Sequence, residues 1–178
     1  MEIIFTRDGE RRYSTIAVRD DGVTLRVPAF DQPKWIPHDL AHYVIEQALH
    51  LRLGFWGCVA AGAIFPGMRV ISGRQPPHAA ARSHAVIRET VAGQYGTEAE
   101  AQVAFFIQIT QQHVAADRAT AYLRHRMWQP GKSTREPLCT DDVRRVCTEL
   151  YAMQERWQVL AIGQNIIVTW PHAIRRKR

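Results

Sequence analysis

The sequence contains few cysteines, and no two of them have the spacing of a redox or metal-binding motif. The three that are present, Cys58, Cys139 and Cys147, form an odd set without a Cys-x-x-Cys pair. Small folds that depend on disulfides usually carry an even number of cysteines at close spacing. The pattern therefore predicts free thiols and argues against a disulfide-stapled fold.

The sequence also lacks a long hydrophobic run. The longest candidate extends from Phe55 to Pro66 and is interrupted by glycines, so it falls short of the ~20 apolar residues that span a bilayer. It fits a buried loop or a short helix. The segment from Met1 to Asp8 has no basic stretch leading into an apolar core, as a secretory signal would have. We therefore expect a cytoplasmic protein without membrane contact.

The composition is that of one globular domain. The chain has 178 residues, of which 46% are hydrophobic and 22% charged, and its formal net charge is +6. Such a length allows a single sizeable core, so we expect one domain over residues 1–178. Part of the positive charge lies in a basic tail at 171–178. The charge permits contact with nucleic acid, but no helix-turn-helix, RRM or zinc-finger pattern favours it.

Residues 1–28 have the pattern of an antiparallel β-meander. Apolar and polar residues alternate in three short runs, and Asp-Gly pairs at Asp8-Gly9 and Asp21-Gly22 separate them. Asp-Gly between β-branched runs is a strong hairpin signal. We therefore expect three strands, with turns centred on these two pairs.

Residues 37–158 are predicted to be mainly helical because their apolar residues recur at helical spacing. Four helices are expected, over about 37–53, 79–94, 97–128 and 140–158, with loops at 66–78 and 129–137. The region 159–170 ends in a β-branched run typical of a strand. Strands followed by helices predict an α+β fold, in which the meander, extended by the C-terminal strand, packs against about four helices.

One row of polar residues on the first predicted helix points to chemistry. His38 and His42 are four residues apart, so they share one helix face, and Asp39 follows the first of them. Two imidazoles one turn apart can bind one zinc-like ion. Glu46 continues the row, but it lies ~12 Å along the axis from His38. It is therefore expected to hydrogen-bond His42 in the second coordination shell.

The segment His38-Asp39-Leu40-Ala41-His42 resembles the H-E-x-x-H motif of zincin-type metallopeptidases. The resemblance covers five residues and implies a bound zinc or another divalent metal, with His38 and His42 as ligands. It also implies that Asp39 takes the place of the glutamate that acts as general base. Asp is one methylene shorter than Glu, which argues against peptidase activity. Otherwise the chain resembles short basic bacterial proteins rather than any particular enzyme.

A third protein ligand has to come from another helix. Glu89 is the first candidate, and His84 and Glu100 are the alternatives. Together these residues predict a metal-binding, hydrolase-like protein of unknown substrate. The alternative is a non-catalytic interaction or oligomerisation protein, in which the row of His, Asp and Glu only forms a structural polar network.

Two other segments carry weaker signals. The residues His78, Arg82, Ser83 and His84 flank a helix start, where a basic N-terminus could bind an anion. The stretch Gly54-Phe55-Trp56-Gly57 places glycines on both sides of two aromatic residues. It suits either a pocket wall or the closure of the core.

Overall fold

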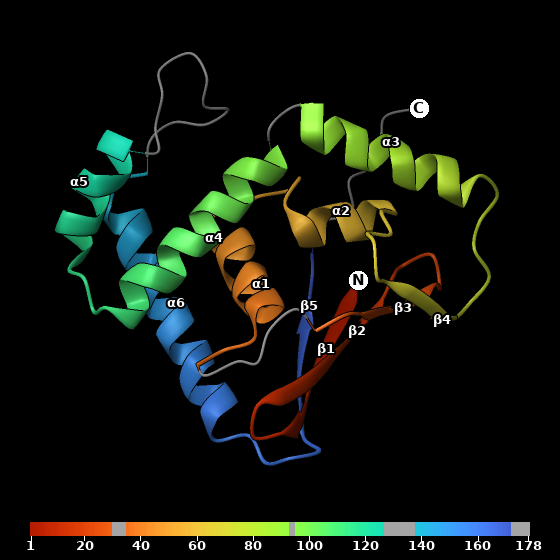
Figure 1. Ribbon diagram of the computed structural model, residues 1–178, viewed down its shortest axis with the longest axis horizontal. Coiled ribbons are helices and arrows are strands. Elements are labelled where there is room, and N and C mark those ends of the chain that lie inside the picture. The colour runs from red at the N-terminus through yellow and green to blue at the C-terminus, as the bar shows by residue number, and fades with distance from the viewer. Residues whose placement is uncertain (30–34, 93–94, 127–137, 172–178) are drawn as a thin grey trace.

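A computed structural model of the chain describes residues 1–29, 35–92, 95–126 and 138–171 (Figure 1). Within these ranges three strands come first, helices and one short strand follow, and the last strand comes after the last helix. Strands and helices are thus largely segregated along the chain. This arrangement confirms the predicted α+β class.

The five strands of the described residues form one antiparallel sheet in the order β4-β3-β2-β1-β5. The three N-terminal strands form the predicted meander, and the C-terminal strand joins it by pairing with β1. The bounds are β1 Glu2–Gly9, β2 Arg12–Val18, β3 Thr24–Val27, β4 Arg69–Ser72 and β5 Asn165–Thr169.

The first hairpin turn differs from the prediction. It lies at Glu10–Arg11 rather than at Asp8-Gly9, because β1 continues through Gly9. The register between β1 and β2 shifts between Arg7 and Gly9. An extra residue in one strand produces such a shift, and a bulge of this kind readily takes up a glycine. The second turn has Asp21 and Gly22 as predicted, and Gly22 has a positive φ of 81°.

The described residues form six helices, and α1 lies among them as the central one. Three of its neighbours are α2, α4 and α6, against which it packs. The bounds are α1 His38–Ala48, α2 Phe55–Ala61, α3 Ala79–Ala92, α4 Tyr95–Gln111, α5 Ala116–Arg126 and α6 Thr140–Gln158.

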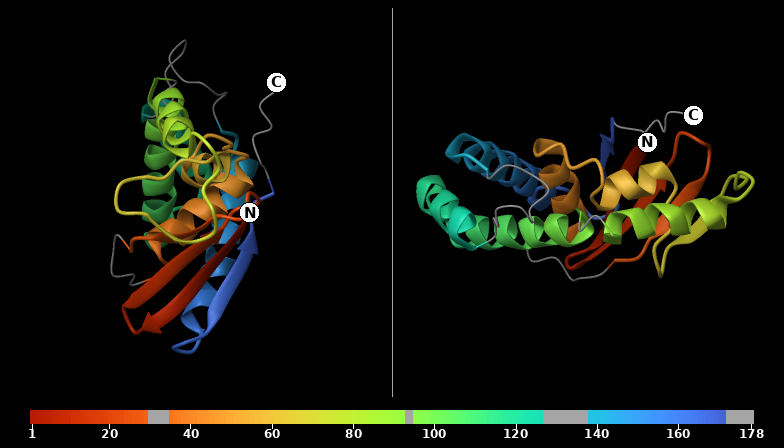
Figure 2. Two further views of the ribbon diagram at one scale, coloured as in Figure 1. Left: turned by 90° about the vertical axis from the view of Figure 1, so that its right-hand side faces the viewer. Right: turned by 90° about the horizontal axis from the view of Figure 1, so that it is seen from above.

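The helices cover one face of the sheet, as the views in Figure 2 show. Ile3, Phe5 and Leu25 are among the strand side chains on that face, and these three have no exposed surface. On the opposite face Ile167 of β5 is half exposed. The core therefore lies between the sheet and a layer led by α1, α4 and α6, and α1 carries its row of polar residues into that layer.

Two helix predictions need correction. The helix expected over 97–128 is two helices, because the chain reverses after α4 with His113 in a left-handed conformation of φ 50°. The first helix ends at Ala48 rather than near Leu53, and α2 is a separate helix. The N-cap of α6 is Cys139, whose amide is held by Asp142.

Some expected elements fall elsewhere or outside the described residues. The expected loop at 66–78 contains the short edge strand β4. The expected connection at 129–137 and most of the basic tail at 171–178 lie outside the described residues. All three cysteines are free, as predicted. None of the helices in the described ranges is long and apolar enough to cross a membrane.

Candidate metal centre

The two histidines of α1 lie one above the other and face α4. His38 is the first residue of the helix and His42 follows one turn later. Their ring centroids are 4.7 Å apart, and the ring planes meet at 65°. His42 is only 3% exposed, whereas His38 is half-buried at the edge of the site. The spacing predicted from the sequence therefore brings the two rings together.

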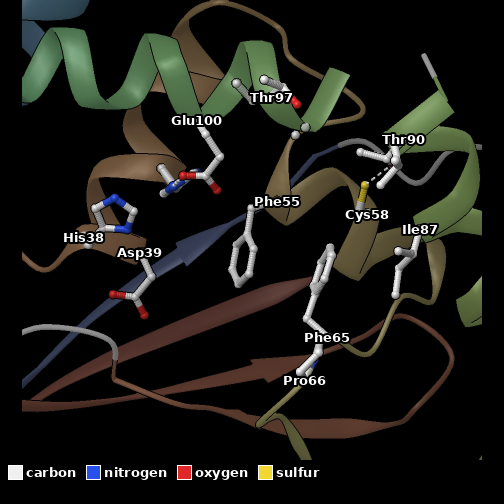
Figure 3. Close-up of a pocket in the computed structure, with 15 residues that line it drawn as sticks. His38, Asp39, Phe55, Cys58, Phe65, Pro66, Ile87, Thr90, Thr97 and Glu100 are labelled. Carbon is white, nitrogen blue, oxygen red and sulfur yellow. Dashed lines mark hydrogen bonds and ion pairs between the residues drawn. The ribbon is translucent and has the colours of Figure 1, made fainter. Parts of the chain in front are cut away.

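Glu100 of α4 completes a group of three metal-ligating side chains (Figure 3). Its Oε2 lies 3.4 Å from His42 Nε2, and one ligand atom from each of His38, His42 and Glu100 lies within 4.8 Å of the other two. The carboxylate of Glu100 is 59% exposed, so it approaches the histidines from the solvent side.

The third ligand predicted first, Glu89, does not belong to this group. Among the described residues the ligand atoms that converge come from His38, His42 and Glu100. Glu89 is exposed on α3, and so is the alternative His84. The structure thus brings the other alternative, Glu100, to the histidines.

Glu46 lies behind His42 in the protein interior. Its Oε1 is 2.9 Å from His42 Nδ1, and its two oxygens accept the backbone N–H groups of Phe55 (2.7 Å) and Trp56 (3.0 Å). Burial raises the pKa of Glu46, and the hydrogen bonds from His42 and the two amides oppose that rise. Its role as a second-shell residue of a metal ligand stays a prediction.

His42 lies between two carboxylates. Burial alone would lower its pKa, but hydrogen bonds to Glu100 and Glu46, together with their negative charge, outweigh burial and raise the pKa of His42 to about 9. The surroundings of this ring therefore stabilise positive charge. A proton on the ring is one source of such charge, and a metal cation bound at Nε2 is the other.

Asp39, the candidate base, is fixed to the sheet. Thr15 of β2 donates a hydrogen bond of 2.5 Å from its Oγ1 to Asp39 Oδ2, and Trp56 Nε1–H donates to the Asp39 carbonyl (2.8 Å). Figure 3 shows the Asp39 side chain pointing toward the strands, away from Glu100. Asp39 lines the same pocket as the ligand group without belonging to that group.

A pocket of about 810 Å³ opens beside the three ligands. Phe55 of α2 and Phe65 stack in its wall, with ring centroids 5.4 Å apart and planes at 17°. Ile87 and Val91 of α3 also line the pocket. Of the two interpretations of the Gly54–Gly57 stretch, the pocket wall thus applies to Phe55. The closure of the core applies to Trp56, which is fully buried.

Cys58 and Thr90 lie at the end of the pocket away from His38 and Glu100 (Figure 3). Cys58 Sγ lies 3.0 Å from Thr90 Oγ1, and the threonine hydroxyl is also 3.0 Å from the Val86 carbonyl. Burial raises the pKa of the Cys58 thiol to about 11. Thr90, Phe65 and Thr97 line the pocket without having been identified from the sequence. No local pattern marks them, because they become neighbours only when α3 and α4 pack.

The other polar segments serve structural contacts. Ser83 Oγ accepts the Ile64 N–H (2.9 Å), and Arg82 pairs with Asp21 at 2.8 Å. On α6, Arg144 and Arg145 pair with acidic residues of the same helix. Two of the four residues considered for anion binding, Arg82 and Ser83, are thus engaged in contacts within the protein.

Comparison of the chain with protein-family models, with curated proteins and with solved structures gives no match.

Proposed function

We propose that the chain binds one divalent metal ion, zinc in the first place, through His38, His42 and Glu100, and that it is a hydrolase-like protein. The observation that carries the proposal is the convergence of three ligand atoms within 4.8 Å, from two different helices, beside a pocket. Structural zinc sites are usually closed by four protein ligands, whereas catalytic ones have three and leave a position open. The three ligands here match the catalytic type.

The donor set and its spacing suit zinc. Two imidazole nitrogens and one carboxylate oxygen are ordinary zinc ligands, bound at about 2.0–2.2 Å. Two ligands of a tetrahedral ion then lie about 3.4 Å apart, and His42 Nε2 and Glu100 Oε2 are already 3.4 Å apart. The negative charge of Glu100, and of Glu46 behind His42, would offset the charge of a dication.

A metal ion held there would polarise a carbonyl oxygen and make a water molecule more acidic. The chain itself supplies position and proton transfer. Glu46 holds His42 by its Nδ1, which leaves Nε2 directed at the site. Asp39 is the candidate proton acceptor, because it lines the same pocket and Thr15 keeps its carboxylate in place.

The second candidate function is a metal-free polar network in a non-catalytic interaction protein. It is favoured by the hydrogen bonds of Glu46 to the first two amides of α2 and by the bond between Thr15 and Asp39. These contacts tie α1 to α2 and to β2. In this alternative His42 is an imidazolium between two carboxylates, and the site needs no ion.

Measuring metal binding to the purified, metal-free protein distinguishes the two candidate functions. We expect isothermal titration with zinc to give one site per chain, and the His38→Gln and Glu100→Gln variants to bind more than about 100-fold more weakly, because each loses a direct ligand. His84→Gln and Glu89→Gln are matched controls on the exposed face of α3. They should bind zinc like the unaltered protein.

Two results would overturn the proposal. One is the absence of saturable binding of zinc, manganese or iron to the unaltered protein. The other is unchanged zinc affinity in both His38→Gln and Glu100→Gln. A loss of affinity in Glu89→Gln instead would return the third ligand to α3.

A further inference from the structure

The pocket beside His38, His42 and Glu100 is polar at one end and mainly apolar along the rest of its wall. Its polar groups gather at the end formed by α1 and α4, where His42 and Glu100 lie. From there the wall continues over the stacked rings of Phe55 and Phe65 to Ile87 of α3 (Figure 3). A ligand that fills this space therefore contacts polar groups at one end and hydrocarbon along most of its length.

The positive charge that His42 can carry in the pocket wall is paired with the carboxylates of Glu46 and Glu100. Although the chain has a net charge of +6, none of the described residues that line the pocket is an arginine or a lysine. The charged groups near its polar end are the acidic Asp39, Glu46 and Glu100 around His42. Phosphate recognition uses arginine, lysine or a run of free amides. Without a metal ion, this pocket is thus unsuited to nucleotides and other phosphorylated compounds.

The end of the pocket at Cys58 and Thr90 adds little hydrogen-bonding capacity. The Thr90 hydroxyl, which is the polar group there besides the thiol, is already engaged with the Val86 carbonyl and Cys58 Sγ. A volume of about 810 Å³ lies within the usual range of small-molecule sites. The space therefore fits one small molecule with an apolar body.

We propose that the pocket takes a small, uncharged and predominantly apolar carbonyl compound, an ester or amide with an aliphatic or aromatic group, whose carbonyl lies at the polar end beside Glu100. The contact of the carbonyl rests on the proposed metal function. The preference for an uncharged apolar body rests on the pocket wall alone, and it can be measured without metal.

The first experiment measures binding to metal-free protein with the neutral fluorescent probe N-phenyl-1-naphthylamine. We expect saturable binding at one site per chain. Decanamide should displace the probe at a concentration about tenfold or more below that of decyl phosphate, because the phosphate would be placed among carboxylates that already pair with His42. Equal displacement by the two compounds, or better displacement by decyl phosphate, would overturn the proposal.

The second experiment locates the probe with matched double variants. Ile87→Glu/Val91→Glu places two charges on the α3 wall of the pocket, and Val91 is 71% exposed. Val159→Glu/Ile162→Glu makes the same exchanges near the end of α6, at exposed positions outside the pocket. We expect a loss of probe affinity of about tenfold or more in the first and less than about twofold in the second. The reverse pattern would show that the probe binds elsewhere.

Circular dichroism and thermal unfolding establish whether both double variants are folded. If the α3 variant is not, the displacement experiment on the unaltered protein still decides the proposal. Glu100→Gln separates this proposal from the metal proposal, since it should lose zinc affinity and retain binding of the neutral probe. Loss of probe binding in Glu100→Gln, or an unaltered protein that binds zinc but no apolar probe, would overturn the pocket proposal alone.

Discussion

The side chain of Glu46 is fully buried, and its carboxylate lies directly against Gly54, where a larger residue would clash with it. A Cβ atom at Gly54 would lie 2.4 Å from the Glu46 carboxyl carbon and within 2.7 Å of both its oxygens. Those oxygens are held by His42 and by two amides of α2. The glycine is therefore required by close approach and not by a turn conformation, because its φ is −72°.

Replacing Gly54 by alanine is expected to break part of the Glu46 network. We expect Gly54→Ala to lower the free energy of unfolding by about 1–3 kcal/mol, since a buried carboxylate loses donors. Urea unfolding measures the effect. Gly9→Ala is the control, because a Cβ there meets the side chain of Arg12, which can move. Equal stability of Gly54→Ala and the unaltered protein would contradict the packing described.

Asp39 offers a test of the catalytic part of the proposed function. Asp39→Asn keeps the size of the side chain and removes its capacity to accept a proton. With zinc bound, we expect hydrolysis of 4-nitrophenyl octanoate to fall by about 100-fold or more while zinc affinity stays unchanged. Asp117→Asn, at an exposed position on α5, serves as control. Unchanged hydrolysis in Asp39→Asn would remove Asp39 from the chemistry.

The Cys58 thiol should be nearly inert in the folded protein. Burial raises its pKa to about 11, and the side chain has no exposed surface. In a Cys139→Ser/Cys147→Ser variant we expect the remaining thiol to react with Ellman's reagent at pH 8 at least about 100-fold more slowly than after denaturation. The exposed Cys139, left alone in the matched double variant, should react quickly without denaturant.

At the scale of elements, β1 and the end of α6 are joined by one side chain. Arg7 Nη1 donates to the carbonyls of Gln158 (3.0 Å) and Leu160 (2.7 Å), and the Trp157 carbonyl lies at 3.5 Å. Carbonyls at a helix C-terminus lack partners within the helix and carry its negative dipole end. The Arg7 guanidinium supplies these carbonyls with both hydrogen-bond donors and a positive charge. It thereby fixes the direction in which the chain leaves α6 toward β5.

Removal of this contact should loosen α6 from the sheet. We expect Arg7→Met to lower the free energy of unfolding by about 1.5–3 kcal/mol, the range for hydrogen bonds that involve a charged group. Chemical denaturation provides the measurement. Arg12→Met, at an exposed position of β2, is the matched control and should change stability by less than about 0.5 kcal/mol. A similar loss in both variants would count against the helix-end contact.

Sequence patterns predicted those elements whose causes are local. The meander follows from alternation and from the Asp21-Gly22 pair, and the predicted last helix has the bounds of the observed α6. The break between α4 and α5 was missed because no proline or glycine marks it. There the Thr110 carbonyl accepts the Tyr151 hydroxyl (3.0 Å), and His113 turns the chain in a left-handed conformation. That interaction with α6 depends on tertiary packing.

The candidate site likewise combines residues that local sequence brings together with residues that depend on tertiary packing. His38 and His42 could be paired from the sequence because helical spacing alone brings them together. Glu100 could only be named among alternatives, since its approach depends on how α4 packs on α1. The pocket wall contributed by α3 depends likewise on packing between distant segments, so nothing in the local sequence identified it.

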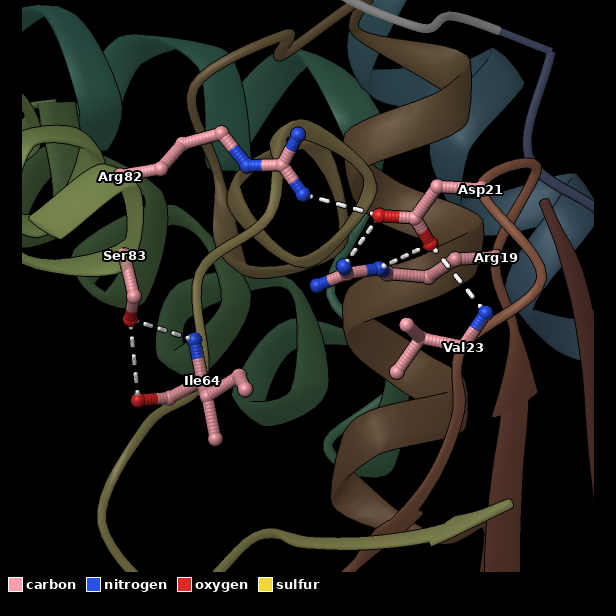
Figure 4. Close-up of polar contacts among 6 residues, drawn as sticks. All are labelled: Arg19, Asp21, Val23, Ile64, Arg82 and Ser83. Atoms are coloured by element: carbon pink, nitrogen blue, oxygen red, sulfur yellow. Dashed lines mark hydrogen bonds and ion pairs between the residues drawn. The ribbon is translucent and has the colours of Figure 1, made fainter. Parts of the chain in front are cut away.

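For the whole molecule, one ion-pair cluster attaches α3 to the sheet (Figure 4). Asp21, in the turn between β2 and β3, pairs with the largely buried Arg19 and with Arg82 of α3. Burial opposes ionisation of Asp21, but the hydrogen bonds from Arg19 and Arg82 outweigh it and hold the pKa of the carboxyl below 3.8. The α3 wall of the pocket is thus attached to the sheet through Arg82, near the start of α3.

This cluster predicts a specific pH dependence. Because the pKa of Asp21 is lower in the folded protein than in the unfolded chain, its contribution to stability is complete above the unfolded value of 3.8 and is lost as the pH falls through the folded value. The stability difference between the unaltered protein and Asp21→Asn should therefore shrink between pH 5 and pH 2. Urea unfolding at several pH values measures it, with Asp117→Asn as control. A constant difference would contradict the ion pair.

The pairing of β1 with β5 has a consequence for the order of events during synthesis. The registered contacts run from Glu2 opposite Thr169 to Thr6 opposite Asn165, so β5 is translated after every other described strand and helix. Until Thr169 has left the ribosomal exit tunnel, one edge of β1 has no partner. An open edge is a template for pairing with another chain. During synthesis the nascent polypeptide is therefore exposed to pairing with another chain at β1, until β5 occupies that edge of the sheet.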